Sequence, residues 1–270
     1  HTGSSAASDV YKRQLIPFLI TLFAGLSTAL GGLVVFFGNT EKLNWLSFTM
    51  SFAAGVMLYV SFVEILPESY LEFKLTNDQN TALLYVLGFF VFGTLFAIFT
   101  DKLLPEQKIN SQVNKSITSK NNKIYRSGIL IALTMALHNF PEGIVTFIGS
   151  VNDLSFGLVI GLAIALHNIP EGMAISVPIY HATGSKKKAF LYSALSGFTE
   201  PLGALFCYFV INSYLDDFLT AAVMSIVSGI MIFISIFVLM PLSFEYKDKY
   251  EHILGLVIGM VVIGISIYLM

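Results

Sequence analysis

Long apolar runs divide the chain, and this feature restricts its fold more than any other. Apolar residues make up 55% of the 270 residues and charged residues only 12%, against roughly 25% charged residues in a soluble domain. An α-helix needs about 20 apolar residues to cross a bilayer. Runs of about that length occupy residues 15–37, 45–66, 82–103, 127–149, 155–180, 188–211, 218–241 and 252–270. The sequence therefore predicts an all-α polytopic membrane protein with eight transmembrane helices.

The positive charges predict how these helices are oriented. Twelve of the thirteen Lys and Arg residues after residue 14 lie in connections on one side of the predicted membrane, and only Lys74 lies on the other. Connections rich in Lys and Arg face the cytosol. Successive connections alternate between basic and non-basic, and with eight helices this alternation places both termini outside.

Two segments differ from the long apolar runs. One precedes the predicted eight-helix domain at 15–270, and the other lies inside it. Residues 1–14 begin without Met and lack the apolar core of a signal peptide, so we expect a non-native or disordered N-terminal segment. Residues 104–125, between the third and fourth apolar runs, are rich in Asn, Ser and Lys. Such a composition cannot bury enough apolar surface to fold alone, and it predicts a flexible cytosolic loop.

A hexapeptide occurs twice, and each copy lies inside an apolar run. Residues 138–143 read HNFPEG, and residues 167–172 read HNIPEG. The His and Glu of each copy are four residues apart and the Asn and Glu three apart, so the three side chains share one helical face. The two runs are joined by a short connection, which brings both copies to a similar depth as antiparallel neighbours. Two carboxylates so placed would not both ionise without a cation between them, so the repeat predicts a metal site.

A third acid, Glu200, lies in the middle of the run 188–211 and is followed by Pro201. A charge at the centre of a transmembrane helix costs roughly 2.5–3.5 kcal/mol, whereas a hydrogen bond between such helices contributes only about 0.6 kcal/mol. Hydrogen bonding alone is therefore too weak to explain three buried acids. A shared divalent cation explains them better.

The paired HNxPEG motifs, on the fourth and fifth of eight predicted helices, resemble the Zrt-, Irt-like protein (ZIP) family of divalent-metal transporters, most closely its bacterial ZupT branch. The resemblance covers nearly the whole chain after residue 14. It implies a 3+2+3 arrangement with inverted repeats in the bacterial cytoplasmic (inner) membrane. It also implies a midplane site that holds two metal ions per chain, and uptake by alternating access at that site. By that resemblance, His138, Glu142, His167 and Glu171 form one metal site, and Asn139, Asn168 and Glu200 complete a second one that shares the two glutamates.

The donor atoms limit the metals and the chemistry. Imidazole, carboxylate and amide oxygen suit zinc, iron(II), manganese and cobalt, with cadmium also considered, and a single cysteine argues against Cu(I). An intramembrane zinc-dependent hydrolase is the alternative, but the His-Glu-x-x-His arrangement is absent, so we expect a carrier and no enzyme. Divalent metal ions and the lipid bilayer are the expected partners, with no nucleic acid; a homodimer is left open.

Some polar residues near the ends of the predicted helices keep two interpretations. Glu64 and Glu68 could collect cations at an entrance or could be ordinary solvated acids. His181 and the pair Glu251-His252 could receive metal at the cytosolic end or serve as interfacial residues. One position departs from the bacterial branch, where an acidic pair often precedes Leu-Met-Pro in the seventh helix: here Phe237-Val238 stands there.

Overall fold

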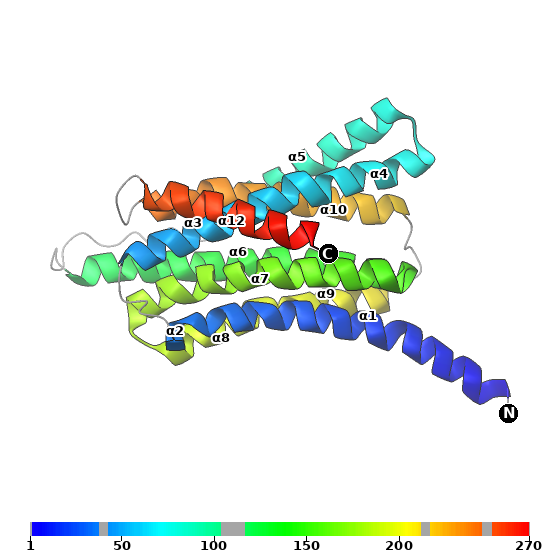
Figure 1. The fold of residues 1–270 in the computed structure, drawn as a ribbon, viewed down its shortest axis with the longest axis horizontal. Helices are drawn as coiled ribbons and strands as arrows, with labels where there is room; N and C mark the ends of the chain where they lie inside the picture. Colours follow the sequence, from blue (N-terminus) through cyan, green and yellow to red (C-terminus); the bar gives the residue numbers. More distant parts are fainter. Residues whose placement is uncertain (1, 38–42, 104–116, 212–216, 245–249, 270) are drawn as a thin grey trace.

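In this computed structural model the described residues are 2–37, 43–103, 117–211, 217–244 and 250–269, and their regular structure is entirely helical (Figure 1). The helices of the first half are α1 (Thr2–Gly32), α2 (Val34–Phe37), α3 (Leu43–Val60), α4 (Leu66–Thr76), α5 (Gln79–Leu103) and α6 (Ile117–Asn152). Those of the second half are α7 (Leu154–Thr183), α8 (Lys186–Gly197), α9 (Thr199–Phe206), α10 (Asp217–Phe233), α11 (Met240–Phe244) and α12 (Glu251–Tyr268). Three π-helical segments continue α3, α9 and α10, namely η1 (Ser61–Ile65), η2 (Cys207–Ile211) and η3 (Ile234–Leu239).

Six of the predicted spans are confirmed as helices long and apolar enough to cross a membrane. Within the described ranges they are Gln14–Phe37, Ser47–Thr76, Gln79–Lys102, Ile131–Val151, Gly157–Thr183 and Asp217–Phe244. The last predicted span is a shorter apolar helix, His252–Tyr268. Eight spans in a 3+2+3 arrangement therefore stay a prediction.

The sixth predicted run is not one uninterrupted helix, because α8 and α9 are separated at Phe198. Pro201 has no N–H to donate to the carbonyl of Gly197, so one α-helical hydrogen bond is lost at this point. The interruption places Glu200 in the first turn of α9.

Helices α1 and α6 extend into the two segments that the sequence set apart. Helix α1 begins at Thr2, so residues 2–14 are helical; that they are non-native stays a prediction. Helix α6 begins at Ile117, before the predicted end of the cytosolic loop. The rest of that predicted loop, 104–116, lies outside the described residues.

Helices α6 and α7 form the centre of the molecule (Figure 1). Only Asp153 separates them, so they run antiparallel, as the two copies of the motif predicted. Helices α1, α8 and α9 contact one side of this pair. We call these three helices, together with α6 and α7, the site bundle. Helices α3 and α10 contact the other side and pack with α4, α5 and α12 in the flanking bundle, which includes η1, η3 and α11.

Glycines allow the closest helix approaches within each bundle. A Cβ built on Gly143 of α6 would lie 2.0 Å from the carbonyl oxygen of Glu200 in α9, and one on Gly203 would lie 2.0 Å from the carbonyl oxygen of Phe140. In the flanking bundle, a Cβ on Gly55 would lie 2.1 Å from the carbonyl oxygen of Leu256. None of the described close glycine contacts joins one bundle to the other. Backbones therefore interlock inside each bundle, while side chains form the surface between them.

Two of the π-helical segments precede a proline. The Leu66 N–H donates to the Ser61 carbonyl at the end of η1, directly before Pro67. The Met240 N–H donates to the Ser235 carbonyl at the end of η3, directly before Pro241. Because proline lacks an N–H, the wider turn before it keeps each helix continuous while shifting its hydrogen bonds by one residue. π-bulges of this kind often occur at functional sites.

Asp78 caps α5 in the turn that follows α4. Its Oδ2 accepts the Thr81 hydroxyl at 2.5 Å, and its Oδ1 accepts the backbone N–H groups of Thr81 at 3.2 Å and Asn80 at 3.0 Å. These hydrogen bonds, that from the Thr81 hydroxyl above all, hold the pKa of the Asp78 carboxyl below its ordinary value. The carboxylate thereby satisfies N–H groups that have no partner inside the helix.

Candidate metal centre

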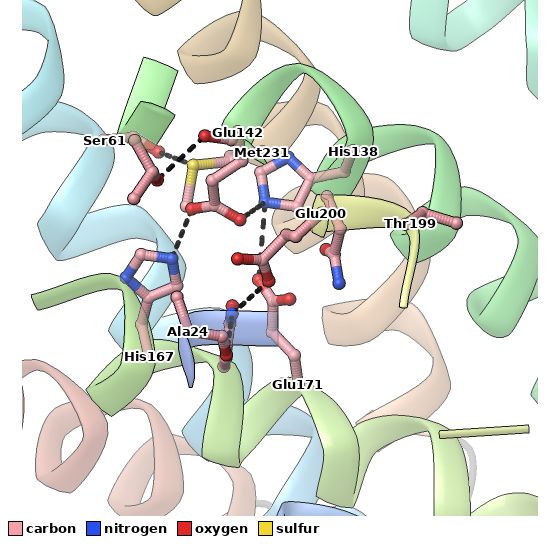
Figure 2. A network of polar contacts seen from close by, with 12 residues as sticks. Ala24, Ser61, His138, Glu142, His167, Glu171, Thr199, Glu200 and Met231 are labelled. Carbon is pink, nitrogen blue, oxygen red and sulfur yellow. Dashed lines mark hydrogen bonds and ion pairs between the residues drawn. The ribbon is translucent and has the colours of Figure 1, made fainter. Parts of the chain in front are cut away.

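The seven predicted ligands are buried together where α6, α7 and α9 meet (Figure 2). Glu142 is 2% exposed and the other six are 0% exposed. Helix α6 carries one copy of the motif, α7 carries the other, and the first turn of α9 supplies Glu200. Their approach within the protein interior is the arrangement that the sequence predicted for the two motifs.

Glu142 stands between the two histidines. Its Oε1 lies 2.5 Å from His167 Nε2, and its Oε2 lies 3.5 Å from His138 Nε2. His138 Nε2 is also 3.5 Å from Glu171 Oε1. The ligand atoms of His138, Glu142 and Glu171 all lie within 4.8 Å of one another. Zinc bonds to nitrogen and oxygen are about 2.0–2.2 Å long, so small side-chain movements would bring these atoms around one ion.

The amides and Glu200 extend this cluster. The Asn168 amide nitrogen donates to Glu200 Oε1 and, at 3.0 Å, to the Ala24 carbonyl oxygen. Asn139, with its amide turned so that the nitrogen faces acceptors, donates to the Met135 carbonyl at 2.8 Å and to Glu171 Oε2 at 3.2 Å. The two asparagines thus tie Glu171 and Glu200 to the backbone.

Several nitrogen and oxygen atoms that could bind a metal ion are buried in the cluster without a hydrogen-bond partner. They are Nε2 of His138, Oε2 of Glu142, Nδ1 of His167, Oδ1 of Asn168, Oε1 of Glu171 and Oε2 of Glu200. Buried polar atoms are almost always paired in folded proteins. Unpaired nitrogen and oxygen atoms that lie close together, as on His138, Glu142 and Glu171, are what a divalent cation needs as ligands.

The glycine that ends each motif explains how the other helices reach the cluster. A Cβ on Gly143 would meet the Glu200 backbone of α9 at 2.0 Å, and one on Gly172 would meet the Thr28 carbonyl oxygen of α1 at 1.9 Å. A side chain at either position would push the neighbouring helix away. The complete motif therefore supplies the predicted ligands and also allows the close approach that brings in Glu200 and the Ala24 carbonyl.

The structure places the sequence candidates Glu64, Glu68 and His252 outside this cluster. Glu64 and Glu68 line a cavity of about 90 Å³ that also reaches Glu142 and His167. His252, near the start of α12, packs against Phe244 with 4.2 Å between ring centroids. The start of α12 lies at the opposite end of the molecule from the turn between α6 and α7 (Figure 1). Sequence reasoning missed the carbonyl acceptors of Ala24 and Met135, because a backbone oxygen leaves no signal in residue type.

Comparison with known proteins gives one consistent result. Residues 99–267 match the family model described as ZIP Zinc transporter. The "Zinc transporter ZupT" of Campylobacter jejuni is 43% identical over 96% of this chain and 98% of its own length. Proteins with the same name from Streptococcus mutans (43% identical, 93% of this chain and 96% of its own) and Nitratidesulfovibrio vulgaris (40%, 94% and 97%) are similar. With paired HNxPEG motifs in two apolar helices of the interior, the chain belongs to the ZIP family, whose members are integral membrane transporters and not enzymes.

Proposed function

We propose that this protein carries zinc through the bacterial cytoplasmic membrane into the cytosol, with the buried cluster as its binding site. The observation that carries the proposal is the position of Glu142 between two histidines, in a cluster where several buried nitrogen and oxygen atoms lack hydrogen-bond partners. The name shared by the similar proteins supports zinc as the substrate.

The proposed site holds two ions that share Glu142 and Glu171. The first ion takes the two histidines and both glutamates. The second takes the shared glutamates with Asn139, Asn168 and Glu200. The unpaired oxygens of Asn168 and Glu200 support the second position. Because two of its ligands are neutral amides, the second position should bind metal more weakly than the first.

The proposed transport mechanism is alternating access at this site. The cavity is lined along α7 from His167 back to Val159, towards the turn at Asp153. By the positive-inside rule that end faces outside, so this state would be open outward. The absence of close glycine contacts between the bundles, among those described, supports movement of the site bundle against the flanking bundle. The eight-span 3+2+3 arrangement is part of the same proposal.

The donor set also suits iron(II), manganese, cobalt and cadmium, and we propose these ions as further substrates. One chain contains all the proposed ligands, so a homodimer would combine two complete pathways. The proposed domain organisation is one transporter domain at 15–270.

Metal flux into proteoliposomes tests the function and its site. Purified protein should carry Zn(II) into vesicles loaded with a zinc-sensitive dye. Glu142→Ala should lower flux to background, because it removes a ligand from both ions. Glu200→Gln keeps the side-chain volume, and it should lower the bound metal from two ions per chain to one while reducing the maximal rate. Near-normal flux in Glu142→Ala would refute the site, and two ions per chain in Glu200→Gln would refute the binuclear model.

A further inference from the structure

The cavity beside the metal centre has one wall from each bundle. The site bundle contributes Glu142 and His167, together with apolar residues of α7. The flanking bundle contributes Glu64 and Glu68, and its other lining residues are apolar. An ion that crosses such a cavity loses bound water molecules. Few polar groups in the cavity can take the place of that water. The two acids are therefore the only charged replacements that the described flanking bundle offers in this cavity.

His167 is oriented as a metal ligand that faces away from Glu142. Its Nε2 lies 2.5 Å from the Glu142 carboxylate. In the neutral tautomer whose Nε2–H donates to this carboxylate, Nδ1 keeps its lone pair. Nδ1 is buried without a hydrogen-bond partner, and Figure 2 shows this nitrogen on the side of the ring opposite to Glu142. Histidines that bind metal usually donate their other N–H to a carboxylate in this manner.

Glu64 is the matching group on the opposite wall. Its Oε2 is buried without a hydrogen-bond partner. It lies in η1, where the π-helical turn displaces side chains from the positions that a regular α-helix would give them. Glu68 follows four residues later, one helical turn nearer the end of the span.

The flanking bundle has no such acid in its second proline-terminated π-helical segment. Ser61 and Pro67 are six residues apart, as are Ser235 and Pro241, and Glu64 occupies the position that Val238 occupies in η3. The acid is therefore a feature of η1 and is not required to build a π-helical turn before proline.

We propose that Glu64 and Nδ1 of His167 form a capture site, which holds a divalent cation before it reaches the binuclear centre. The inference rests on the proposed function. Because Glu64 belongs to the flanking bundle and His167 to the site bundle, the capture site exists only while the cavity is open. Movement of the site bundle separates the two ligands and commits the ion to the inner site.

Zinc flux into proteoliposomes that contain the Glu64→Gln variant tests the capture site. This substitution keeps the shape of the side chain and removes its charge. Loss of a supporting carboxylate weakens metal sites about 10- to 100-fold, so KM should rise at least about tenfold while the maximal rate stays within about twofold. Glu72→Gln is the matched control, because Glu72 lies on the same span but does not line the cavity. Glu64→Asp retains the charge on a shorter side chain, and its KM should fall between wild type and Glu64→Gln.

A second measurement separates ligation from a structural role. In detergent, zinc should bind Glu64→Gln more slowly in stopped-flow mixing with a fluorescent chelator, while the number of ions bound at equilibrium stays at the wild-type value. Wild-type flux with an unchanged KM in both Glu64 variants would overturn the capture site and leave the proposed function standing. Absence of zinc flux in the wild type would overturn the proposed function and the capture site together.

Discussion

Replacing Gly143 by Ala should separate Glu200 from the other ligands without removing any of them. Gly143 follows Glu142 in α6, and a Cβ there would lie 2.0 Å from the Glu200 carbonyl oxygen, 2.6 Å from its carbonyl carbon and 2.7 Å from its Cα. All three atoms belong to backbone, which cannot rotate away as a side-chain end can. Helices α6 and α9 must therefore move apart.

The size of this movement follows from the contact distance. Real Cβ atoms essentially never approach another heavy atom closer than 3.0 Å, so α9 must retreat by at least about 1 Å. Overpacking of this kind costs about 1–3 kcal/mol of stability. A displacement of about 1 Å at a reacting group can lower a rate about 100-fold. The Asn168–Glu200 hydrogen bond, which spans α7 and α9, should break for the same reason.

Zinc flux in proteoliposomes and thermal unfolding in detergent measure the two effects. Gly143→Ala should carry zinc about 100-fold more slowly and unfold at a lower temperature. Gly88→Ala in α5 is the matched control, since a Cβ at Gly88 meets nothing within 4 Å. Gly203→Ala, which strikes the Phe140 carbonyl oxygen across the same interface, should repeat the Gly143 result. Wild-type flux in Gly143→Ala would refute the view that this glycine sets the position of Glu200.

Three further predictions concern orientation, metal preference and acid stability. In a Cys207→Ser chain in intact cells, Ser185→Cys should resist a membrane-impermeant thiol reagent and Asp217→Cys should react; labelling of Ser185→Cys from outside would reverse the assigned orientation. His138→Ala removes a nitrogen donor while oxygen donors remain, so competitive uptake should shift from zinc towards manganese; an unchanged preference would contradict a histidine ligand. The hydrogen bonds to Asp78 lower its folded pKa below the unfolded value of about 3.9, so their stabilisation is present above that pH and is lost as pH falls through the folded pKa. Melting temperatures in detergent should therefore fall less between about pH 5 and pH 3 in Asp78→Asn than in wild type, and identical slopes would show that this cap does not respond to acid.

Residue spacing predicted the approach of the ligands but not the contacts that fix them. The four-residue spacing of His138 and Glu142 put both on one helical face, and their 3.5 Å contact follows from it. The repeat of the motif in the next helix likewise predicted contacts between the two copies. The bond from Asn168 to the Ala24 carbonyl had no signal in the sequence, because any residue type supplies a carbonyl oxygen.

The helix interruption at Phe198 shows a different limit. The run 188–211 is long and mostly apolar, and hydropathy does not register the loss of a single hydrogen bond. Pro201 indicated that one backbone hydrogen bond is missing here, but a proline in a membrane helix can also cause a bend without a break. The close approach of Gly197 to the Gly25 carbonyl oxygen of α1 is a tertiary contact that composition cannot reveal.

The burial of the ligands has a consequence for the solvents in which the protein is handled. No predicted ligand is more than 2% exposed. In an apolar 18-residue window of each span, 72% of the residues are buried for Ile131–Val151 against 22% for Gln79–Lys102. Lipid or detergent therefore touches the periphery and not the cluster. Zinc affinities measured at equilibrium in micelles should describe the cluster as it is in a bilayer. Transport rates, which require lipid-facing helices to shift, should instead vary with acyl-chain length and membrane thickness.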